Sequence, residues 1–285
     1  MRTLLVVAAL ALLPCSLDAQ LSIAPASPHA QLTQQVGLAN VTLDYSRPSV
    51  NEREIFGGLI AFGKIWRTGA NASTKLTFDR DVRFGGEDVP AGTYALYTIP
   101  GAERWTIVLH TNTELWGAGN YDASQDLLRV DVPVVKLADH VESLTLDFQN
   151  FHFEGADLVI RWDDTQVAVP VEVPNDEAVM AEIRAKVIEA TEPVSAQDYF
   201  SAAVYYHKTG RDLQLAAGWM DNALAMQPQA FWMVYARAEL AYDMGDMDRA
   251  RQGAELARKL AGQSPSGDYG YVAKSELLLK KIQRG

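Results

Sequence analysis

The sequence predicts an α+β protein of two domains, an antiparallel β-sandwich or jelly-roll-like domain followed by a tail of α-helical repeats. Residues 31–173 contain short runs rich in β-branched and aromatic residues, separated by turn residues about every ten positions. After Pro174, alanine and methionine become frequent, and apolar residues recur every three or four positions. This second pattern is typical of amphipathic helices. We therefore predict a β-sandwich over 31–173 and a helical domain over 174–285.

The β-domain is predicted from eight candidate strands with no helical stretch between them, an arrangement that favours antiparallel pairing. Residues 93–99 are apolar or aromatic on both faces and are expected in the middle of a sheet. Gly85, Gly86 and residues 150–152 are predicted turns or bulges. The candidate strands are 41–46, 75–78, 93–99, 105–110, 127–135, 143–151, 157–162 and 167–173.

The helical domain is predicted to contain six helices. Asn175 is expected to cap the first of them. Ser195 and Asp198 resemble a capping box at the start of the second, with aspartate in place of the usual glutamate or glutamine. The predicted helices are 176–190, 195–209, 212–226, 230–244, 247–261 and 268–282.

An internal repeat relates the middle helices. Ala216 and Ala250 are 34 positions apart, as are Ala223 and Ala257, whereas Gly210 and Gly245 are 35 positions apart. A period of 34 with small residues at helix contacts resembles the tetratricopeptide repeat, so we predict a tetratricopeptide-like tail. Two such units are fewer than a free-standing solenoid usually has. We therefore expect the tail to pack on the β-domain or on a protein partner.

The first 19 residues are predicted to be a secretory signal peptide. A basic start at Arg2 precedes an unbroken apolar run over 4–13, and Ala19 supplies a small residue for cleavage. Residues 20–30 are expected to be a linker. The protein is therefore predicted to be exported, to the periplasm or the extracellular space. Lipoprotein anchoring at Cys15 is the less favoured alternative, because Pro14 stands where a small residue is needed.

Composition excludes several classes of protein. The chain has 25 basic and 36 acidic residues, a net charge of −11, which disfavours nucleic-acid and anionic-membrane surfaces. A single cysteine cannot form an intrachain disulfide. The apolar run over 4–13 is too short to span a bilayer, so we expect no transmembrane segment. Residues 30–172 hold 11 basic and 20 acidic side chains and so carry −9 of the charge.

Six motifs of the β-domain follow one another in an order that resembles a known bacterial family, the domain of unknown function 2911. The resemblance covers about residues 31–172 and implies a secreted β-rich domain, often with a tetratricopeptide-like tail, but no activity. One departure is Glu52, because members commonly have glycine before the arginine that corresponds to Arg53, so the turn there is expected to differ. The motifs are Gln35-Val36-Gly37, Tyr45-Ser46-Arg47-Pro48, Ile55-Phe56-Gly57, Trp66-Arg67-Thr68-Gly69-Ala70-Asn71, Ala91-Gly92-Thr93-Tyr94-Ala95-Leu96-Tyr97 and Leu128-Arg129-Val130.

The densest group of candidate binding residues is the segment 64–71. In an extended conformation Trp66 and Arg67 lie on opposite faces, with Asn71 in the following turn. An indole, a guanidinium and a carboxamide suit a ligand site for sugars or carboxylates. In the structural alternative, Arg67 pairs with a buried acid such as Asp44 or Asp79, and Asn71 satisfies backbone groups of the loop.

Three further residues are candidates for ligand binding. Arg47 either lines the same site as Trp66 and Arg67 or ties its loop to the sheet. Trp116 and Tyr121 flank a glycine-rich loop and either stack on a sugar ring or pack back over the edge of the sandwich. The loop lacks the lysine and the helix start of a phosphate-binding loop.

The sequence shows no catalytic or metal-binding motif. Its five histidines lack metal-ligand spacing, and no nucleophile elbow is present, so we expect neither metal nor cofactor. The favoured function is a non-catalytic ligand- or protein-binding module, or an assembly module, of the bacterial envelope, with the tail engaging a protein. The alternative is a hydrolase of envelope glycans or small esters that uses carboxylates or His152. Trp219, Phe231, Trp232, Tyr235 and Tyr242 form either the core of the tail or a partner-binding face.

Overall fold

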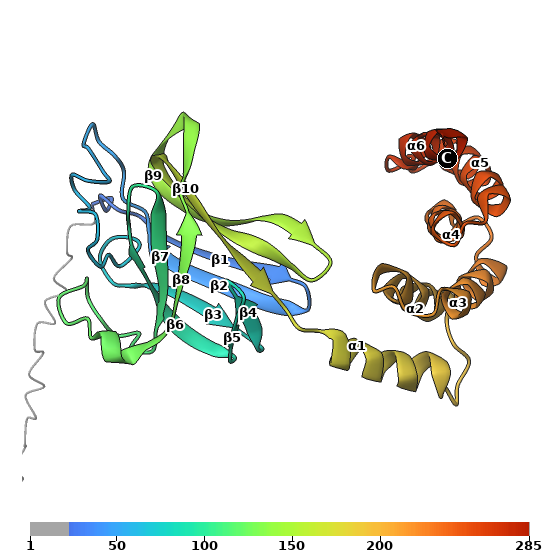
Figure 1. The fold of residues 1–285 in the computed structure, drawn as a ribbon, viewed down its shortest axis with the longest axis horizontal. Helices are drawn as coiled ribbons and strands as arrows, with labels where there is room; N and C mark the ends of the chain where they lie inside the picture. Colours follow the sequence, from blue (N-terminus) through green and yellow to red (C-terminus); the bar gives the residue numbers. More distant parts are fainter. Residues whose placement is uncertain (1–22, 285) are drawn as a thin grey trace, which may run out of the picture. The chain divides into compact units, whose positions relative to one another are not determined.

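The computed structural model describes residues 23–284, and the chain divides after Pro174 into a β unit and a helical unit (Figure 1). The predicted signal peptide, Cys15 and the start of the predicted linker lie outside the described residues. The first strand, β1, begins at His29, so its first two residues fall within the predicted linker.

The β unit contains two antiparallel sheets, as predicted. The order of the larger sheet is β1-β2-β3-β6-β7-β8, formed by His29–Val36, Ala39–Ser46, Thr74–Phe78, Gly92–Ile99, Arg104–His110 and Asp126–Pro133. The order of the smaller sheet is β5-β4-β10-β9, formed by Glu87–Val89, Val82–Phe84, Gly155–Glu172 and Val135–His152.

The predicted strands are all present, and the structure adds three. The predictions 157–162 and 167–173 are two parts of one strand, β10, which pairs with β9 through several register shifts. The missed strands β4 and β5 have three residues each, too few to show an alternation. The missed edge strand β1 has only a weak apolar pattern. Gly85 and Gly86 form the predicted turn, with φ of 61° and 92°.

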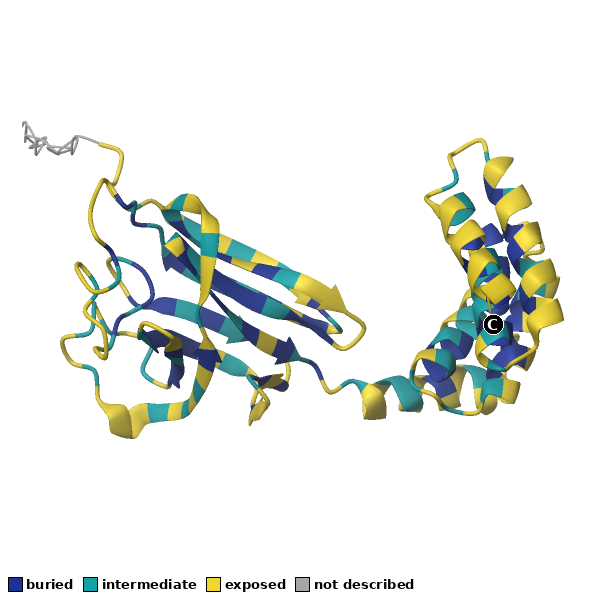
Figure 2. Cartoon of the chain, turned by 45° about the horizontal axis from the view of Figure 1, so that its top comes forward, coloured by how far each residue is buried: buried dark blue, intermediate teal, exposed yellow. Residues whose placement is uncertain are grey.

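The core of the β unit lies between the sheets. Buried and more exposed residues alternate along strands of the β unit (Figure 2). In β2 the odd-numbered residues are buried and the even-numbered ones are more exposed, so the predicted alternation of Val41, Leu43 and Tyr45 is confirmed. At one end of the core four large aromatic side chains pack together, with ring centroids 4.8–6.2 Å apart. They are Phe56, Trp66, Trp105 and Trp162.

The helical unit contains the six predicted helices, each within a few residues of its predicted bounds. The first differs most, because α1 continues into a π-helical turn over Arg184–Ile188. The Ser195 side chain accepts from the Asp198 backbone N–H as predicted, but the Asn175 side chain makes no capping hydrogen bond. The helices are α1 Asp176–Ile183, α2 Ala196–Lys208, α3 Leu213–Met226, α4 Phe231–Asp243, α5 Met247–Gly262 and α6 Tyr271–Arg284. Within residues 23–284, every helix is too short or too polar to cross a lipid bilayer.

The sequence repeat corresponds to repeated helix starts. Asp212 and Asp246, 34 positions apart, each accept a hydrogen bond from the backbone N–H three residues later, which caps α3 and α5. Gly210 and Gly245 precede these caps with φ of 65° and 81°, a conformation that glycine adopts without strain. The repeated alanines Ala216, Ala223, Ala250 and Ala257 are all completely buried. The period therefore reflects the close approach of neighbouring helices.

Two helical glycines provide a matched test of this packing. A Cβ on Gly253 in α5 would lie 2.8 Å from the Cβ of Ala238 in α4, whereas a Cβ on Gly218 in α3 would meet nothing within 4 Å. We expect Gly253→Ala to lower the free energy of unfolding by about 1–3 kcal/mol through overpacking. Gly218→Ala should raise it by up to about 1 kcal/mol, because alanine favours the helix. Urea unfolding of both variants measures the two changes in free energy. Equal changes would contradict the close contact of α4 and α5 at Gly253.

The departure from the family motif at Glu52 has a structural outcome. Asn51 and Glu52 both adopt the left-handed conformation, with φ of 46° and 58°. Glu52 therefore takes a backbone conformation that glycine adopts without strain but that costs other residues about 1–2 kcal/mol each. The Arg53 guanidinium donates to the carbonyls of Val50 (2.9 Å) and Ser49 (2.6 Å) and so closes the turn.

Relief of this strain is measurable. We expect Glu52→Gly to raise the free energy of unfolding by up to about 1 kcal/mol, because glycine adopts a positive φ without a steric cost. Glu52→Ala is the matched control, since it removes the same exposed carboxylate but keeps a Cβ. Chemical denaturation should show a higher free energy of unfolding for the glycine variant alone. Equal free energies of unfolding for the two variants would contradict the strain at Glu52.

Candidate ligand site in the β unit

The segment that contains Trp66 and Arg67 is held against the end of β6. The backbone N–H of Trp66 donates to the carbonyl of Thr98, and the Thr98 N–H donates back, both at 2.8 Å. The Trp66 side chain points into the core, where it is 5% exposed and stacks on Trp162 at 5.7 Å between centroids. Its indole N–H donates to the Gly69 carbonyl (3.1 Å). Trp66 therefore packs as a core residue and does not present an indole platform to a ligand, because burial of so large an apolar ring stabilises the fold.

Arg67 lies on the opposite side of the segment, outside the sandwich core. Its guanidinium forms no hydrogen bond or ion pair with any residue between 23 and 284, and its Nε is buried. The acids considered as its partners are engaged elsewhere, Asp44 with His29 and Asp79 with Asn40. Every other arginine of the described β unit donates a hydrogen bond or lies in an ion pair. Arg67 is thus an unpaired positive charge in an acidic domain.

The backbone around Arg67 is strained. Thr68, a β-branched residue, has a φ of 54°, and Asn71 has a φ of 61°. Thr68 is completely buried, and its carbonyl accepts from the hydroxyl of Thr74 at 2.8 Å. A β-branched residue in this region is an outlier that tertiary contacts must enforce. Such strain is concentrated at functional sites, so the turn itself points to a site.

The loop over 111–125 is fixed beside this turn. The Ser73 N–H donates to the carbonyl of Leu115 (3.1 Å), and the Gly117 N–H donates to the carbonyl of Asn71 (3.2 Å). The buried hydroxyl of Tyr97 donates to the Gly117 carbonyl (2.8 Å). The Asn71 side chain donates to the hydroxyl of Ser46 at the end of β2 (3.2 Å), and not to a backbone group of its own loop as the structural alternative expected.

Three aromatic rings anchor the far end of the loop. Tyr97, His110 and Tyr121 lie 5.1–5.7 Å apart between centroids. The Tyr121 hydroxyl donates to the carboxylate of Asp126 (2.7 Å). Burial, followed by this hydrogen bond, raises the pKa of Tyr121 to about 12. Tyr121 therefore packs back over the sheet. No local sequence pattern indicates that Tyr97 and His110 are its partners.

The loop presents Trp116 to solvent. Its side chain is 75% exposed, although Ala72 pairs with Trp116 through a β-bridge. The next residue, Gly117, has a φ of 72°, and a Cβ there would lie 3.7 Å from Nη1 of Arg67. Arg67, Asn71, Trp116 and Gly117 are thus neighbours, and we call them the Arg67 site.

Arg47 lies outside the Arg67 site. Its Nε donates to the carbonyl of Leu144 (2.9 Å) and its Nη2 to the hydroxyl of Thr145 (2.8 Å), both on β9. These bonds tie the end of β2 to the second sheet. His152, the histidine considered for hydrolysis, is exposed at the end of β9 and pairs with Gly155 in β10. Residues 23–284 contain no cluster of three side chains able to hold a metal ion.

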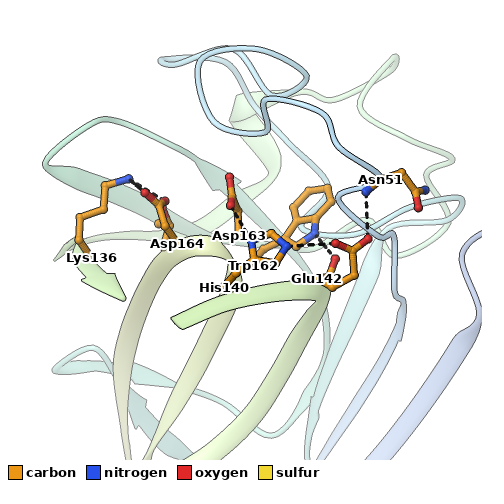
Figure 3. A network of polar contacts seen from close by, with 8 residues as sticks. Asn51, Lys136, His140, Glu142, Trp162, Asp163 and Asp164 are labelled. Atoms are coloured by element: carbon orange, nitrogen blue, oxygen red, sulfur yellow. Dashed lines mark hydrogen bonds and ion pairs between the residues drawn. The ribbon is translucent and has the colours of Figure 1, made fainter. Parts of the chain in front are cut away.

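A polar network lies at the bends of β9 and β10 (Figure 3). The ring of His140 lies between two carboxylates, with Nε2 at 3.0 Å from Glu142 and Nδ1 at 3.1 Å from Asp163. Asp163 has a φ of 55° and lies between two register shifts, which turn its side chain toward His140. Glu142 also accepts from the Asn51 N–H (2.9 Å), and its carbonyl accepts from the Trp162 indole (3.3 Å). The network therefore fixes the strained 51–52 turn on β9.

The comparisons with known proteins give two matches. A family model described as "Protein of unknown function (DUF2911)" matches residues 27–171, which include the whole Arg67 site. This match confirms the resemblance seen in the sequence. Among solved structures, PcrH from Pseudomonas aeruginosa matches at 19% identity and a TM-score of 0.33, over 38% of this chain and 83% of PcrH. A search of curated proteins found no match.

The His140 network should make stability depend on pH. The hydrogen bond to Glu142 is the main cause that raises the pKa of His140 above 6.5, and Asp163 adds to it. A histidine whose pKa is higher in the folded state than in the unfolded state stabilises the fold. This contribution is complete below about pH 6.5 and is lost as the pH rises through the pKa of the folded state. The Asn51 N–H, followed by His140, lowers the pKa of Glu142 below 4.5, so Glu142 remains charged in this window.

We therefore expect His140→Gln to be less stable than the wild type at about pH 5.5 and nearly as stable at about pH 8.5. Urea unfolding at these two values measures the difference. His29→Gln is the control, because it removes another exposed histidine that contacts a single carboxylate. A His140→Gln difference that is constant with pH, or that grows at high pH, would contradict the arrangement.

Proposed function

Because the chain belongs to the DUF2911 family, whose members have no established activity, we propose its function from the geometry of the β unit. The β unit is a non-catalytic binding module that holds a small carboxylate-bearing ligand at the Arg67 site. Arg67 provides the charge, Trp116 provides an exposed ring surface, and Asn71 holds the loop that joins them.

The observation that supports this proposal is the unpaired guanidinium of Arg67. A buried or half-buried charged group without a partner costs free energy, and natural proteins satisfy nearly all such groups. A carboxylate can accept two parallel hydrogen bonds from a guanidinium, which gives a strong and oriented contact. A carboxylate-bearing ligand would thus supply the partner that the described residues do not.

The second support is the rigidity of the surroundings. The loop that displays Trp116 is bonded to residues 71–73 and anchored through Tyr97, His110 and Tyr121. A binding site held by packed supporting residues loses little conformational freedom when its ligand arrives. The strained Thr68 is fixed in the same structure.

Two wider parts of the proposal concern the setting of the protein. We keep the prediction that the protein is exported to the bacterial envelope, since the sequence of residues 1–19 supports it. We also keep the prediction that the helical unit engages a protein partner, supported by its exposed apolar side chains Leu215, Met226, Leu256 and Leu277. The hydrolase alternative gains no support, because His152 pairs within the β9–β10 hairpin on the other sheet.

The proposal is tested by ligand titration. We expect a sugar acid such as glucuronate to bind with saturable calorimetric heat and glucose to bind far more weakly. Arg67→Gln should weaken glucuronate binding by at least about tenfold, which corresponds to about 1.4 kcal/mol. The same variant should keep or increase the free energy of unfolding, because it removes a half-buried charge without a partner.

Arg104→Gln is the matched control, since Arg104 is an exposed arginine of β7 that donates to the carbonyl of Asp131. It should bind as the wild type does. Two results would contradict the carboxylate site. One is that Arg67→Gln binds every sugar acid of a panel as tightly as the wild type does, and the other is that no sugar acid of the panel binds to the wild type.

A further inference from the structure

A cavity of about 760 Å³ lies in the helical unit, between the start of α4 and the turn that joins α5 to α6. Its volume is within the range of small-molecule sites, about 300–1,000 Å³. We propose that this cavity, which we call the aromatic pocket, binds an uncharged carbohydrate. The proposal concerns a site and a ligand class separate from the Arg67 site, so either can fail alone.

The lining of the aromatic pocket has no net charge. No aspartate, glutamate, lysine, arginine or histidine lines it, although 21% of the chain is charged. Burial, together with Glu239, raises the pKa of Tyr271 above its usual value of 10, so this tyrosine adds no charge to the pocket at ordinary pH. A charged ligand would have to give up its hydration here without a counter-charge, which costs several kcal/mol. The ligand class is therefore neutral.

Aromatic rings form much of the pocket. Phe231 contacts Trp232 edge-to-face at 5.2 Å between centroids and contacts Tyr271 at 5.3 Å. Trp232 is 37% exposed although it lies at the start of α4, beside the buried Phe231. Edge-to-face contacts hold the rings in place. The ammonium of Lys274 lies over the Tyr271 ring, 4.5 Å from its centroid, so within this group the surface open to a flat, partly apolar ligand is that of the exposed Trp232. Of the tail aromatics, Trp219 is a core residue, whereas Phe231 and Trp232 both line the pocket.

Tyr269 is the observation that points to a ligand. It lines the pocket, its side chain is 70% exposed, and its backbone has a φ of 48°. The turn does not need this residue for its own closure, because the Asp268 carboxylate accepts from the N–H groups of Gly270 (3.3 Å) and Val272 (3.2 Å). An exposed aromatic side chain in a strained conformation is a costly choice where glycine would serve, and such strain is typical of functional positions.

The remaining lining groups match the edges of a sugar. Gln229, Gln263, Ser264 and Ser266 contribute amides and hydroxyls, and none of these side chains hydrogen-bonds to another described residue. Amides and hydroxyls both donate and accept, as sugar hydroxyls do. A sugar ring has C–H groups on its faces and hydroxyls around its edge, so one molecule meets both the aromatic and the polar lining.

Titration of the purified protein with neutral oligosaccharides tests the proposal, using maltotetraose, cellotetraose and chitotetraose as probes. We expect saturable calorimetric binding of at least one of them, accompanied by a change in tryptophan fluorescence. Tyr269→Gly should weaken this binding by at least about tenfold, because it removes one stacking ring. Its thermal midpoint should stay within about 2 °C of the wild type, because relief of strain offsets the flexibility of glycine.

Met247→Ala is the matched control, since Met247 is an apolar side chain at the start of α5 that is 38% exposed, close to the 37% of Trp232, and lies outside the pocket. It should bind as the wild type does. Trp232→Ala should lose binding like Tyr269→Gly, and because Tyr269→Gly preserves the fold, the test stands even if the tryptophan variant unfolds. Absence of saturable binding by all three probes up to about 10 mM would overturn the proposal. An unchanged affinity of Tyr269→Gly for the sugar would also overturn the proposal. So would saturable binding of a proline-rich peptide to the pocket when no sugar binds.

Discussion

The packing of Trp66 determines where the candidate ligand site of the β unit lies. Its indole is enclosed by Trp105, Trp162 and Phe56, and its backbone pairs with Thr98 at the end of β6. Because side chains of an extended segment alternate, burial of Trp66 forces Arg67 to the outer face of the larger sheet. The tight turn after Thr68 then brings Asn71 beside the loop that displays Trp116. The burial of the Trp66 indole therefore both fills the core and sets the position of the Arg67 guanidinium.

The fold was largely predictable from the sequence, for physical reasons that differ between the units. The alternation in β2 and the capping residues of α2, α3 and α5 are local signals, so the strands and helices that depend on them were located to within a few residues. The edge strand β1 was missed because an edge strand buries little apolar surface. The pairing of β10 with β4 was missed because it joins residues far apart in the chain, and no local pattern encodes it.

The candidate site was predictable only in part. Alternation along an extended segment predicts that Trp66 and Arg67 point in opposite directions. It does not predict which of the two side chains points into the core. The partners of Asp44 and Asp79 are decided by strand register, which placed His29 and Asn40 beside them and left Arg67 without a partner. The aromatic pocket was invisible because its two sides are about 35 residues apart in sequence, and a cavity is a property of packing rather than of composition.

The uneven charge of the chain has a kinetic consequence. The β unit carries a net charge of −9 over residues 30–172, so an anion approaching it meets a repulsive field until it comes within about a Debye length, near 8 Å in physiological salt, of Arg67. A carboxylate that binds there, as we propose, would gain nothing from long-range attraction, so its association should be slow and become faster as salt is added. The affinity of such a site would be set by the dissociation rate, which the rigid loop around Trp116 limits, and not by the rate of encounter.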